Sequence, residues 1–469
     1  MKPLPSPTRA LLALAASSVC AVAPAHADEA ALAAKIEQMQ QQLDALKAEL
    51  RQLKTQPAAA APAATAAVPA PAPATTTATP ATTAAATASP AASNASGAKT
   101  PLPDQMAPTS PYASAAPSTS PLSVFGYGEL NYELYPRNRA QNQIDLARAV
   151  IGFGYRFDDR TRLVAEFEWE HAVTSADDAG EAAVEQFYVE RAFAPTLAGR
   201  AGLFLIPSGL LNTSHEPTQY FGVTRNFVET AIIPTTWREA GIGLSGITSY
   251  DLSWDVGVTT GFNLSAWDPT SEDGKASPLG SIHQEGQFAK AANLSGYGAL
   301  NWRGMPGLLL GGSVFAGKAG QSQPNFPSDG AVVTLAEAHA RYTTGPFDLS
   351  ALYAYGHISD TAPYNLTIVG NPTLVPESFW GAYVQGAWYA WRSEDMQIAP
   401  FVRYERFNTG ASYAELPNGL TPAALRTESV TTLGANFYLT PNIVFKADYQ
   451  WFRTNNLYDR FQLGMGVNF

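Results

Sequence analysis

The segment from Phe461 to Phe469 alternates strictly between apolar side chains and small or polar ones. Gln, Gly, Gly and Asn stand between its five apolar residues, which are Phe461, Leu463, Met465, Val467 and Phe469. Successive side chains of a β-strand point to opposite faces, so this strand has one apolar and one polar face. Such a strand suits a membrane β-barrel, and we predict that it closes the barrel by pairing with the first strand. A half-buried strand of a soluble sandwich is the alternative that this segment leaves open.

The first 27 residues are typical of an export signal. Lys2 and Arg9 precede a short apolar stretch, and Ala25-His26-Ala27 has the small-x-small form of a cleavage site. We therefore predict a signal peptide over residues 1–27. The single cysteine, Cys20, lies within it, so the mature chain has no thiol for disulfides, metal binding or catalysis. Because no other segment approaches the roughly 18 apolar residues of a membrane-spanning helix, membrane insertion requires a barrel.

Two further regions precede the barrel. Between residues 28 and 54, apolar side chains recur at alternating steps of four and three, as in a coiled-coil seam: Leu32, Ile36, Met39, Leu43, Leu46, Leu50 and Leu53. A lone helix of this length is marginal in water, so we predict a periplasmic coiled coil with neighbouring subunits, and an amphipathic helix packed elsewhere is the alternative. Residues 55–120 are almost entirely Ala, Pro, Thr and Ser, which predicts a disordered linker.

Residues 121–469 read as a run of β-strands separated by turn residues. We predict a transmembrane barrel of about 16 antiparallel strands, because short connections alternate with long ones, as in outer-membrane barrels with periplasmic turns and extracellular loops. The long connections include 207–237, 263–289, 358–374 and 408–426. The expected strands are 122–134, 142–156, 161–170, 182–193, 198–206, 238–246, 249–262, 290–302, 306–317, 330–342, 346–357, 375–390, 396–407, 427–439, 442–453 and 459–469.

Charged side chains alternate with apolar ones within these strands. A charge on the lipid face near the membrane midplane costs roughly 2 to 4 kcal/mol, so we expect the charges to face the interior. Sixteen strands enclose more space than side chains fill, which predicts an aqueous pore. The candidate pore-lining residues are Arg148, Arg156, Arg162, Glu166, Glu168, Lys446 and Asp448.

The connection 207–237 is long and contains several apolar residues, among them Phe221, Ile232 and Ile233. A loop of this composition is expected to pack on a surface, and the nearest concave surface is the barrel lumen. We predict that it narrows the pore, with charged residues setting selectivity. The constriction candidates are His215, Glu216, Arg225, Glu229, Arg238 and Glu239; the alternative for each is an ordinary charge at a rim or subunit contact.

At this loop the chain resembles the phosphate-selective porin O and P family. The similar strings are Gly202-Leu-Phe-Leu-Ile-Pro-Ser-Gly-Leu, His215-Glu216-Pro217, Phe221-Gly-Val, Val228-Glu229-Thr-Ala-Ile-Ile-Pro-Thr-Thr-Trp237 and Glu239-Ala-Gly-Ile-Gly243. The similarity covers the barrel and is strongest from about 182 to 262. It implies a trimeric outer-membrane channel with a loop folded into each pore, and phosphate as a solute.

The charge of the barrel differs from what the phosphate-selective members show, since arginine ladders and lysine clusters line their path. Residues 121–469 hold 4 Lys and 18 Arg against 34 Asp and Glu, a net charge of −12. A local cluster of arginines is able to focus anions despite an acidic total. The candidates for such a cluster are Arg148, Arg156, Arg225 and Arg238.

Other functions find less support in the sequence. The histidines His171, His215, His283, His339 and His357 have no catalytic or metal-binding spacing, and no nucleotide-binding motif is present, so we predict a non-enzyme without metal or cofactor. The acidic balance disfavours nucleic acid. The expected partners are outer-membrane lipid, two further copies in a homotrimer, and small hydrophilic solutes or anions. Tyr220, Tyr383 and Trp388 suit a sugar slide, and an aromatic girdle at the membrane interface or lipid-facing packing is the alternative. The competing function is an envelope protein that tethers the outer membrane to the cell wall through the coiled coil and linker.

Overall fold

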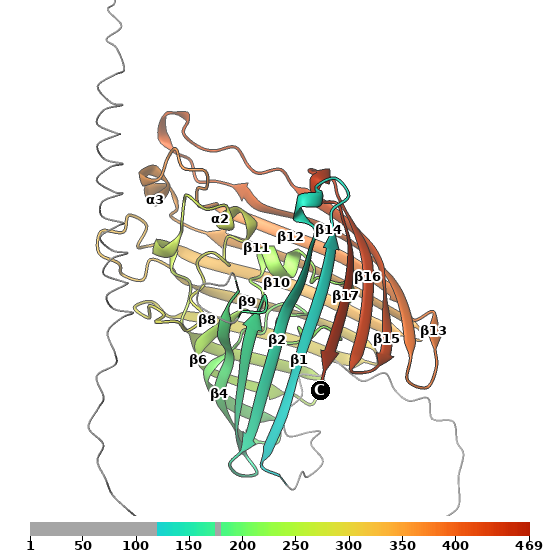
Figure 1. Cartoon of the computed structure of the whole chain (residues 1–469). Coiled ribbons are helices and arrows are strands. Elements are labelled where there is room, and N and C mark those ends of the chain that lie inside the picture. Colours follow the sequence, from blue (N-terminus) through green and yellow to red (C-terminus); the bar gives the residue numbers. More distant parts are fainter. Residues whose placement is uncertain (1–119, 174–179) are drawn as a thin grey trace, which may run out of the picture. The chain divides into compact units, whose positions relative to one another are not determined.

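The computed structural model of the chain describes residues 120–173 and 180–469 (Figure 1). The predicted signal peptide, the coiled coil and the linker up to residue 119 lie outside the described residues and stay predictions. No helix within the described ranges is long and apolar enough to cross a membrane.

The described residues form one closed antiparallel sheet of sixteen long strands and one two-residue strand, β13. The predicted barrel of about sixteen strands is confirmed. The strands are β1 (Leu122–Leu134), β2 (Gln143–Arg156), β3 (Thr161–Glu170), β4 (Ala182–Ala194), β5 (Leu197–Leu205), β6 (Arg238–Ile247), β7 (Leu252–Thr259), β8 (Ser295–Met305), β9 (Leu308–Lys318), β10 (Val332–Thr344), β11 (Phe347–Ile358), β12 (Ser378–Trp388), β13 (Trp391–Arg392), β14 (Gln397–Ser412), β15 (Glu428–Thr440), β16 (Ile443–Phe452) and β17 (Arg460–Asn468).

Short helical turns occur only between strands in the part of the chain that is described. They are η1 (Arg139–Gln141), the π-helical turn η2 (Val228–Ile232), η3 (Leu264–Ala266), α2 (Asp273–Ala276), α3 (Ala362–Thr367), η4 (Pro417–Gly419) and η5 (Asn456–Tyr458). Figure 1 shows α2 and α3 at the same rim of the barrel, among the long connections.

The last strand closes the barrel against the first. β17 pairs with β1 from Tyr127 opposite Asn468 to Leu134 opposite Phe461, and its other edge pairs with β16. Side chains alternate as the sequence predicts, since Leu463 and Met465 are exposed on the outer face whereas Gln462 is fully buried on the inner face. Closure leaves no open edge, so the backbone hydrogen bonds around the ring are satisfied within the sheet.

The connections sort onto two rims. Short turns such as 195–196, 306–307 and 441–442 join strands at one rim, and long connections such as 206–237, 260–294 and 359–377 join them at the other. This distribution follows the sequence prediction. Several strands differ from their predicted limits, most of all β8, which begins at Ser295 and not at 290, and β14, which extends to Ser412 and not to 407. β7 ends at Thr259 and not at 262, because Phe262 leaves the sheet and joins the buried core of the connection that follows.

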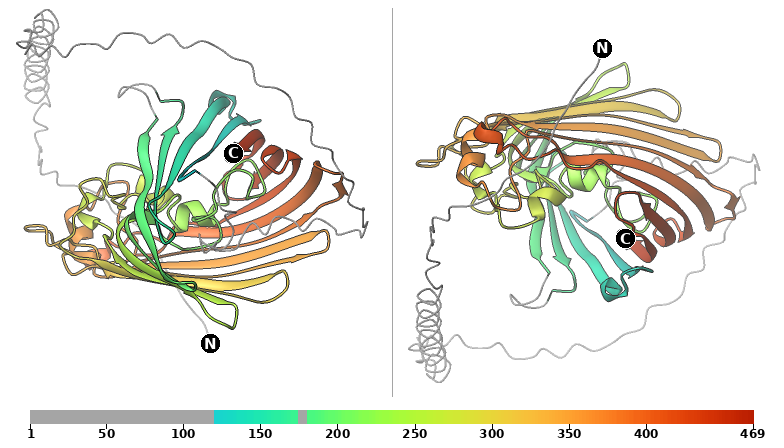
Figure 2. Two further views of the ribbon diagram at one scale, coloured as in Figure 1. Left: turned by 90° about the horizontal axis from the view of Figure 1, so that it is seen from below. Right: turned by 90° about the horizontal axis from the view of Figure 1, so that it is seen from above.

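The connection between β5 and β6, residues 206–237, lies inside the ring of strands, and we call it the inner loop. Figure 2 views the barrel along its length and shows this segment, with the η2 turn, within the ring. Its apolar residues are buried in the main core with side chains of the barrel wall and of the long loops. The loop's contribution includes Ile206, Leu210, Val228, Ile232, Ile233 and Trp237. Burial of this many apolar side chains fixes the loop against the wall.

Candidate functional site

The tip of the inner loop is clamped to the barrel wall by charged side chains. The guanidinium of Arg403 on β14 donates to the carbonyl oxygen of Phe221 at 3.0 Å, and the Glu405 carboxylate accepts from the Phe227 amide at 2.6 Å. Asp448, on β16, accepts from the amide of Val223 at 2.6 Å. Arg403 and Glu405 also pair with each other at 2.6 Å and are almost completely buried. Backbone groups of the loop therefore depend on wall charges for their hydrogen bonds.

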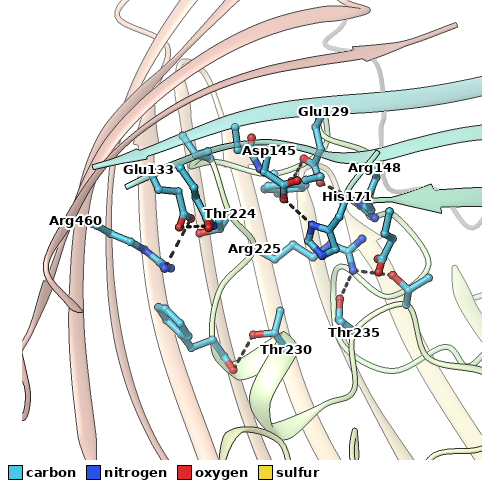
Figure 3. Close-up of a pocket in the computed structure, with 18 residues that line it drawn as sticks. Glu129, Glu133, Asp145, Arg148, His171, Thr224, Arg225, Thr230, Thr235 and Arg460 are labelled. Atoms are coloured by element: carbon cyan, nitrogen blue, oxygen red, sulfur yellow. Dashed lines mark hydrogen bonds and ion pairs between the residues drawn. The ribbon is translucent and has the colours of Figure 1, made fainter. Parts of the chain in front are cut away.

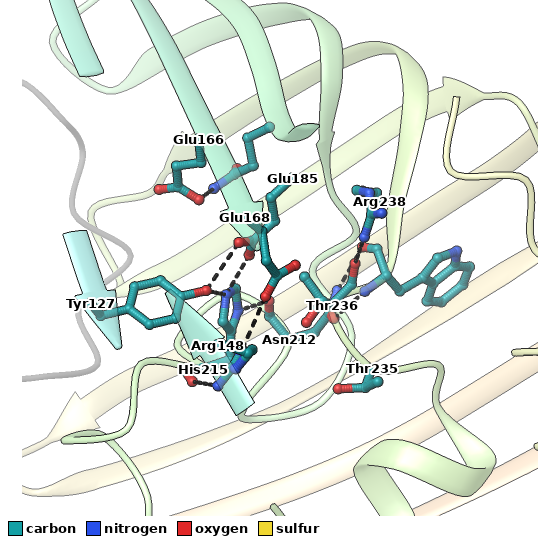
Figure 4. A network of polar contacts seen from close by, with 12 residues as sticks. Tyr127, Arg148, Glu166, Glu168, Glu185, Asn212, His215, Thr235, Thr236 and Arg238 are labelled. Atoms are coloured by element: carbon teal, nitrogen blue, oxygen red, sulfur yellow. Dashed lines mark hydrogen bonds and ion pairs between the residues drawn. The ribbon is translucent and has the colours of Figure 1, made fainter. Parts of the chain in front are cut away.

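The first part of the loop is held by a polar network on the wall at β1, β2 and β4, drawn in Figure 4. His215 Nδ1 lies 2.9 Å from the Asn212 carbonyl oxygen, to which it donates, because a carbonyl oxygen only accepts. Its Nε2 lies 2.5 Å from a carboxylate oxygen of Glu185, on β4, and 2.8 Å from the Tyr127 hydroxyl, on β1. The Arg148 guanidinium donates to the His215 carbonyl oxygen at 3.1 Å. The structure therefore places His215 as a link between loop and wall.

Glu229 lies in the interior of the loop. One carboxylate oxygen accepts from the amides of Leu210 and Leu211 at 2.6 and 2.7 Å, and the other accepts from the Asn226 side chain at 2.7 Å and the Tyr383 hydroxyl at 3.0 Å. Burial raises the pKa of Glu229 above its ordinary value, and the four donors offset this only in part. A carboxylate with every oxygen occupied in this way organises the loop.

The two candidates at the start of β6 are also engaged. Arg238 is buried and its guanidinium lies 2.9 Å from the Glu285 carboxylate in the connection 260–294. Glu239 is fully buried and accepts from the Trp237 indole at 3.1 Å and from the Thr260 hydroxyl at 2.5 Å. Both side chains join the inner loop to the neighbouring long loop.

His283 makes this contact between loops sensitive to acid. Burial, together with the Arg238 guanidinium, lowers the pKa of His283 from 6.5 to about 4, and Glu285 and Glu181 are its acidic neighbours. If the connection 260–294 were detached, His283 would bind a proton near pH 6.5, whereas in the docked connection it binds one only near pH 4. Acidification across this interval is therefore expected to weaken docking by at most about 3 kcal/mol.

Hydrogen exchange of peptides spanning 279–290, corrected for its intrinsic pH dependence, should rise as the pH falls. The His283→Asn variant should lose most of this rise, and an equal rise in that variant would contradict the assignment.

A cavity of about 380 Å³ separates the inner loop from the wall formed by β1, β2, β3 and β17. Figure 3 shows its polar lining, with Arg225 extending from the loop. We call it the loop–wall cavity. Its charged lining residues are Glu129, Glu133, Asp145, Arg148, Glu170, His171, Arg225 and Arg460, and Thr224, Thr230, Thr235 and Thr236 supply hydroxyls from the loop.

The candidate pore-lining residues divide between this cavity and other parts of the interior. Arg148 lines the cavity and pairs with Glu129 at 2.8 Å. The other candidates do not line it. Two of them contact the inner loop: the Lys446 ammonium lies 3.5 Å from the centre of the Tyr220 ring, and Asp448 accepts from the loop tip. The rest contact wall or rim residues: Glu168 is 3.9 Å from Arg148, Glu166 accepts from the Gln186 amide at 2.6 Å, Arg162 pairs with Glu190 at 3.1 Å, and Arg156 donates to the Ser120 carbonyl oxygen at 3.2 Å.

The structure thus brings together only part of the predicted arginine cluster. Arg148 and Arg225 line the same cavity, whereas Arg156 ends β2 at the short-turn rim and Arg238 binds Glu285. Glu216 is half-buried in the loop, and the described residues offer its carboxylate no hydrogen-bond partner. The wall residues that grip the loop were not singled out from the sequence: Tyr127, Glu129, Glu185, Arg403 and Glu405.

Two of the histidines considered for catalysis or metal binding make polar contacts with neighbouring residues of the barrel. Within the described ranges, no group of three or more His, Cys, Asp or Glu side chains is arranged to hold a metal ion. His339 lies between Glu337 and Asn301 on the inner wall, and His171 contacts Asp145 at 2.8 Å. Of the three aromatics, Tyr220 in the inner loop is buried against Glu129 of the wall, Tyr383 on β12 is buried against Glu229 of the loop, and Trp388 is half exposed.

Comparison with known sequences finds one relative that is similar enough for the two chains to belong to the same family. A protein of Aquifex aeolicus (strain VF5), described as an uncharacterized protein, is 30% identical over 359 residues, which are 72% of this chain and 79% of the relative. No protein-family model matches the sequence. Membership of the phosphate-selective porin O and P family therefore stays a prediction.

Comparison of structures finds outer-membrane porins. Salmonella typhi OmpF, solved in complex with daunomycin, matches with a TM-score of 0.50 and 14% identity over 74% of this chain and 97% of OmpF. The outer membrane channel DcaP of Acinetobacter baumannii matches with a TM-score of 0.46 and 12% identity over 74% of this chain and 97% of DcaP. The likeness to OmpF shows that the fold is a porin-type barrel.

Proposed function

Because the chain belongs to the same family as the Aquifex aeolicus protein and folds as a porin-type barrel, we propose that it forms a water-filled outer-membrane channel. Small hydrophilic solutes would diffuse through it without catalysis or a cofactor. The observation that carries this proposal is the loop–wall cavity, a polar space beside a loop that is fixed on both sides. An interior lined by charge retains water, whereas an apolar constriction would expel it.

In this proposal the inner loop is the constriction, and its charged residues have two different roles. Arg225 faces the passage, while His215, Glu229, Arg238 and Glu239 hold the loop in position. A rigid loop gives the passage a fixed width. The long-loop rim would then be extracellular and the short-turn rim periplasmic. A homotrimer remains part of the proposal and rests on the resemblance to the phosphate-selective porin O and P family, because the predicted coiled coil implies partners without fixing their number.

We propose weak ion selectivity in place of strong phosphate selectivity. The cavity lining has four carboxylates against three guanidinium groups, and most of these charges are paired with each other. A ring of uncompensated arginines would be needed to concentrate phosphate. Arg225 alone supplies an uncompensated positive charge to this cavity among the described residues.

Planar-bilayer recording of the purified chain tests the channel. We expect stepwise conductance, grouped in threes for a trimer, with a small reversal potential in a salt gradient and no block by phosphate. Arg225→Ala should shift the reversal potential toward cation preference, because it removes the free positive charge. Arg137→Ala, at an exposed residue outside the cavity, is the matched control and should leave it unchanged. Absence of conductance steps would refute the channel, and phosphate block would restore the anion-specific alternative.

A further inference from the structure

Charges on the inner wall outside the loop–wall cavity largely cancel in local pairs. Several arginines lie within 3.1 Å of a carboxylate on the same strand or one or two strands away: Arg162 with Glu190, Arg200 with Asp255, Arg341 with Asp348, and Arg403 with Glu405. A paired charge attracts a passing ion weakly, because its partner opposes it at nearly the same distance. These paired sites are therefore expected to bind a passing solute only weakly.

The loop–wall cavity differs because one guanidinium and one carboxylate of its lining have no charged side-chain partner within residues 120–173 and 180–469. Arg148 pairs with Glu129, Asp145 contacts His171, and Arg460 lies 3.7 Å from Glu133. Of the charged lining residues, Arg225 and Glu170 then have no ion-pair partner among the residues that the structure describes. Each is therefore available to a solute.

The Arg225 guanidinium is presented by the loop with open donors. Its Nη1 donates to the hydroxyls of Thr235 and Thr236, while Nε and Nη2 have no partner in the described part of the chain. The planar guanidinium suits a carboxylate, because its parallel donors match the two oxygens. The hydroxyls of Thr235 and Thr236 accept from Arg225 and so keep their own hydrogens to donate, whereas Thr224 and Thr230 donate to groups of the protein.

Glu170 presents the opposite charge from the wall. It is the last residue of β3, it lines the same cavity, and its carboxylate lies within the electrostatic range of Arg225. The wall carboxylates Asp145 and Glu133, labelled in Figure 3, line the same cavity. The loop side of the cavity is thus a carboxylate-binding side, and the wall side attracts an ammonium group.

We propose that the loop–wall cavity is a binding site for zwitterionic solutes of amino-acid size, with the solute carboxylate on Arg225 and its ammonium on Glu170. This inference rests on the proposed channel function. A zwitterion gains from both sides at once, whereas a solute with one charge gains from one side and is repelled by the other. The cavity volume of about 380 Å³ lies within the roughly 300–1,000 Å³ of small-molecule sites.

Uptake of labelled solutes into liposomes containing the full chain tests this site. The probes are glutamine as zwitterion, N-acetylglutamine as anion, glutaminamide as cation, and a neutral sugar of similar size. The pH is held at about 6, below the ordinary α-amino pKa, so that the ammonium groups stay charged. Glutamine should enter about three- to tenfold faster than either singly charged derivative, as a weak pair of charge contacts allows.

Two variants locate the preference. Arg225→Gln and Glu170→Gln should each remove this preference, measured as glutamine uptake relative to that of its two derivatives, because each removes one of the two charges that hold the zwitterion. Arg392→Gln, on β13 at the short-turn rim, is the matched control and should retain it. Equal entry of glutamine and its derivatives, with sugar uptake intact, would overturn the zwitterion site alone. Loss of all uptake in the unmodified chain would overturn the channel itself.

Discussion

Replacing Glu229 with alanine is expected to release the inner loop from the barrel wall and to widen the channel. The substitution leaves four buried donors without an acceptor: the amides of Leu210 and Leu211, the Asn226 side chain and the Tyr383 hydroxyl. Each unsatisfied donor costs about 1 to 3 kcal/mol, so the docked loop should lose several kcal/mol. Single-channel conductance and current noise should both increase, and backbone amides of residues 210–233 should exchange faster.

Two comparisons separate this effect from a general loss of folding. Glu216→Ala removes a carboxylate from the same loop without leaving a described donor unpaired, so its conductance should match the unmodified chain. Glu229→Gln keeps one oxygen for the Leu210 and Leu211 amides and should have a smaller effect. Unchanged conductance and loop exchange in Glu229→Ala would show that the loop is held by apolar burial alone.

The strands were predictable because their signals are local. Alternation of apolar and polar residues identifies each strand, and turn residues identify its ends, so the predicted count of sixteen is confirmed. The same signals failed at the ends of the connection between β7 and β8: residues 260–262 and 290–294 were predicted as strand but lie outside the sheet, and Phe262 packs into a loop core. Periodicity cannot distinguish an apolar residue on the lipid face from one buried under a neighbouring loop.

For the candidate site, the sequence predicted that the loop packs in the lumen but not what each of its charged side chains contacts. Apolar residues in a long loop correctly indicated that the loop packs on the lumen, because exposing them to water is unfavourable. The sequence could not predict whether a given charged side chain is enclosed by the protein or faces the cavity. Glu229 and Arg225 are four positions apart in one loop, yet one is enclosed by four donors and the other faces a cavity. That difference depends on Tyr383, more than 150 residues away in the chain.

The Arg403→Met variant is expected to detach the loop tip, through a pair that the sequence did not reveal. Arg403 and Glu405 alternate with outward-facing residues on β14, as any lumen-facing pair does, and only the folded loop buries them. Removing the guanidinium leaves the Glu405 carboxylate buried without its cation and the Phe221 carbonyl oxygen without its donor. Breaking a buried pair in this way costs about 3 to 5 kcal/mol. The free energy of unfolding from denaturant titration should fall by this amount.

A double-variant comparison identifies the cause of that loss. Arg403→Met combined with Glu405→Leu removes both charges, so it should be less destabilised than Arg403→Met alone, although the Phe227 amide then lacks its acceptor. Arg392→Met, on the exposed β13, serves as the control for loss of an arginine and should change stability by less than about 0.5 kcal/mol. If the double variant were as unstable as Arg403→Met, or less stable, the uncompensated Glu405 charge would not be the cause. The loss would then come from the loop hydrogen bonds, which both variants break.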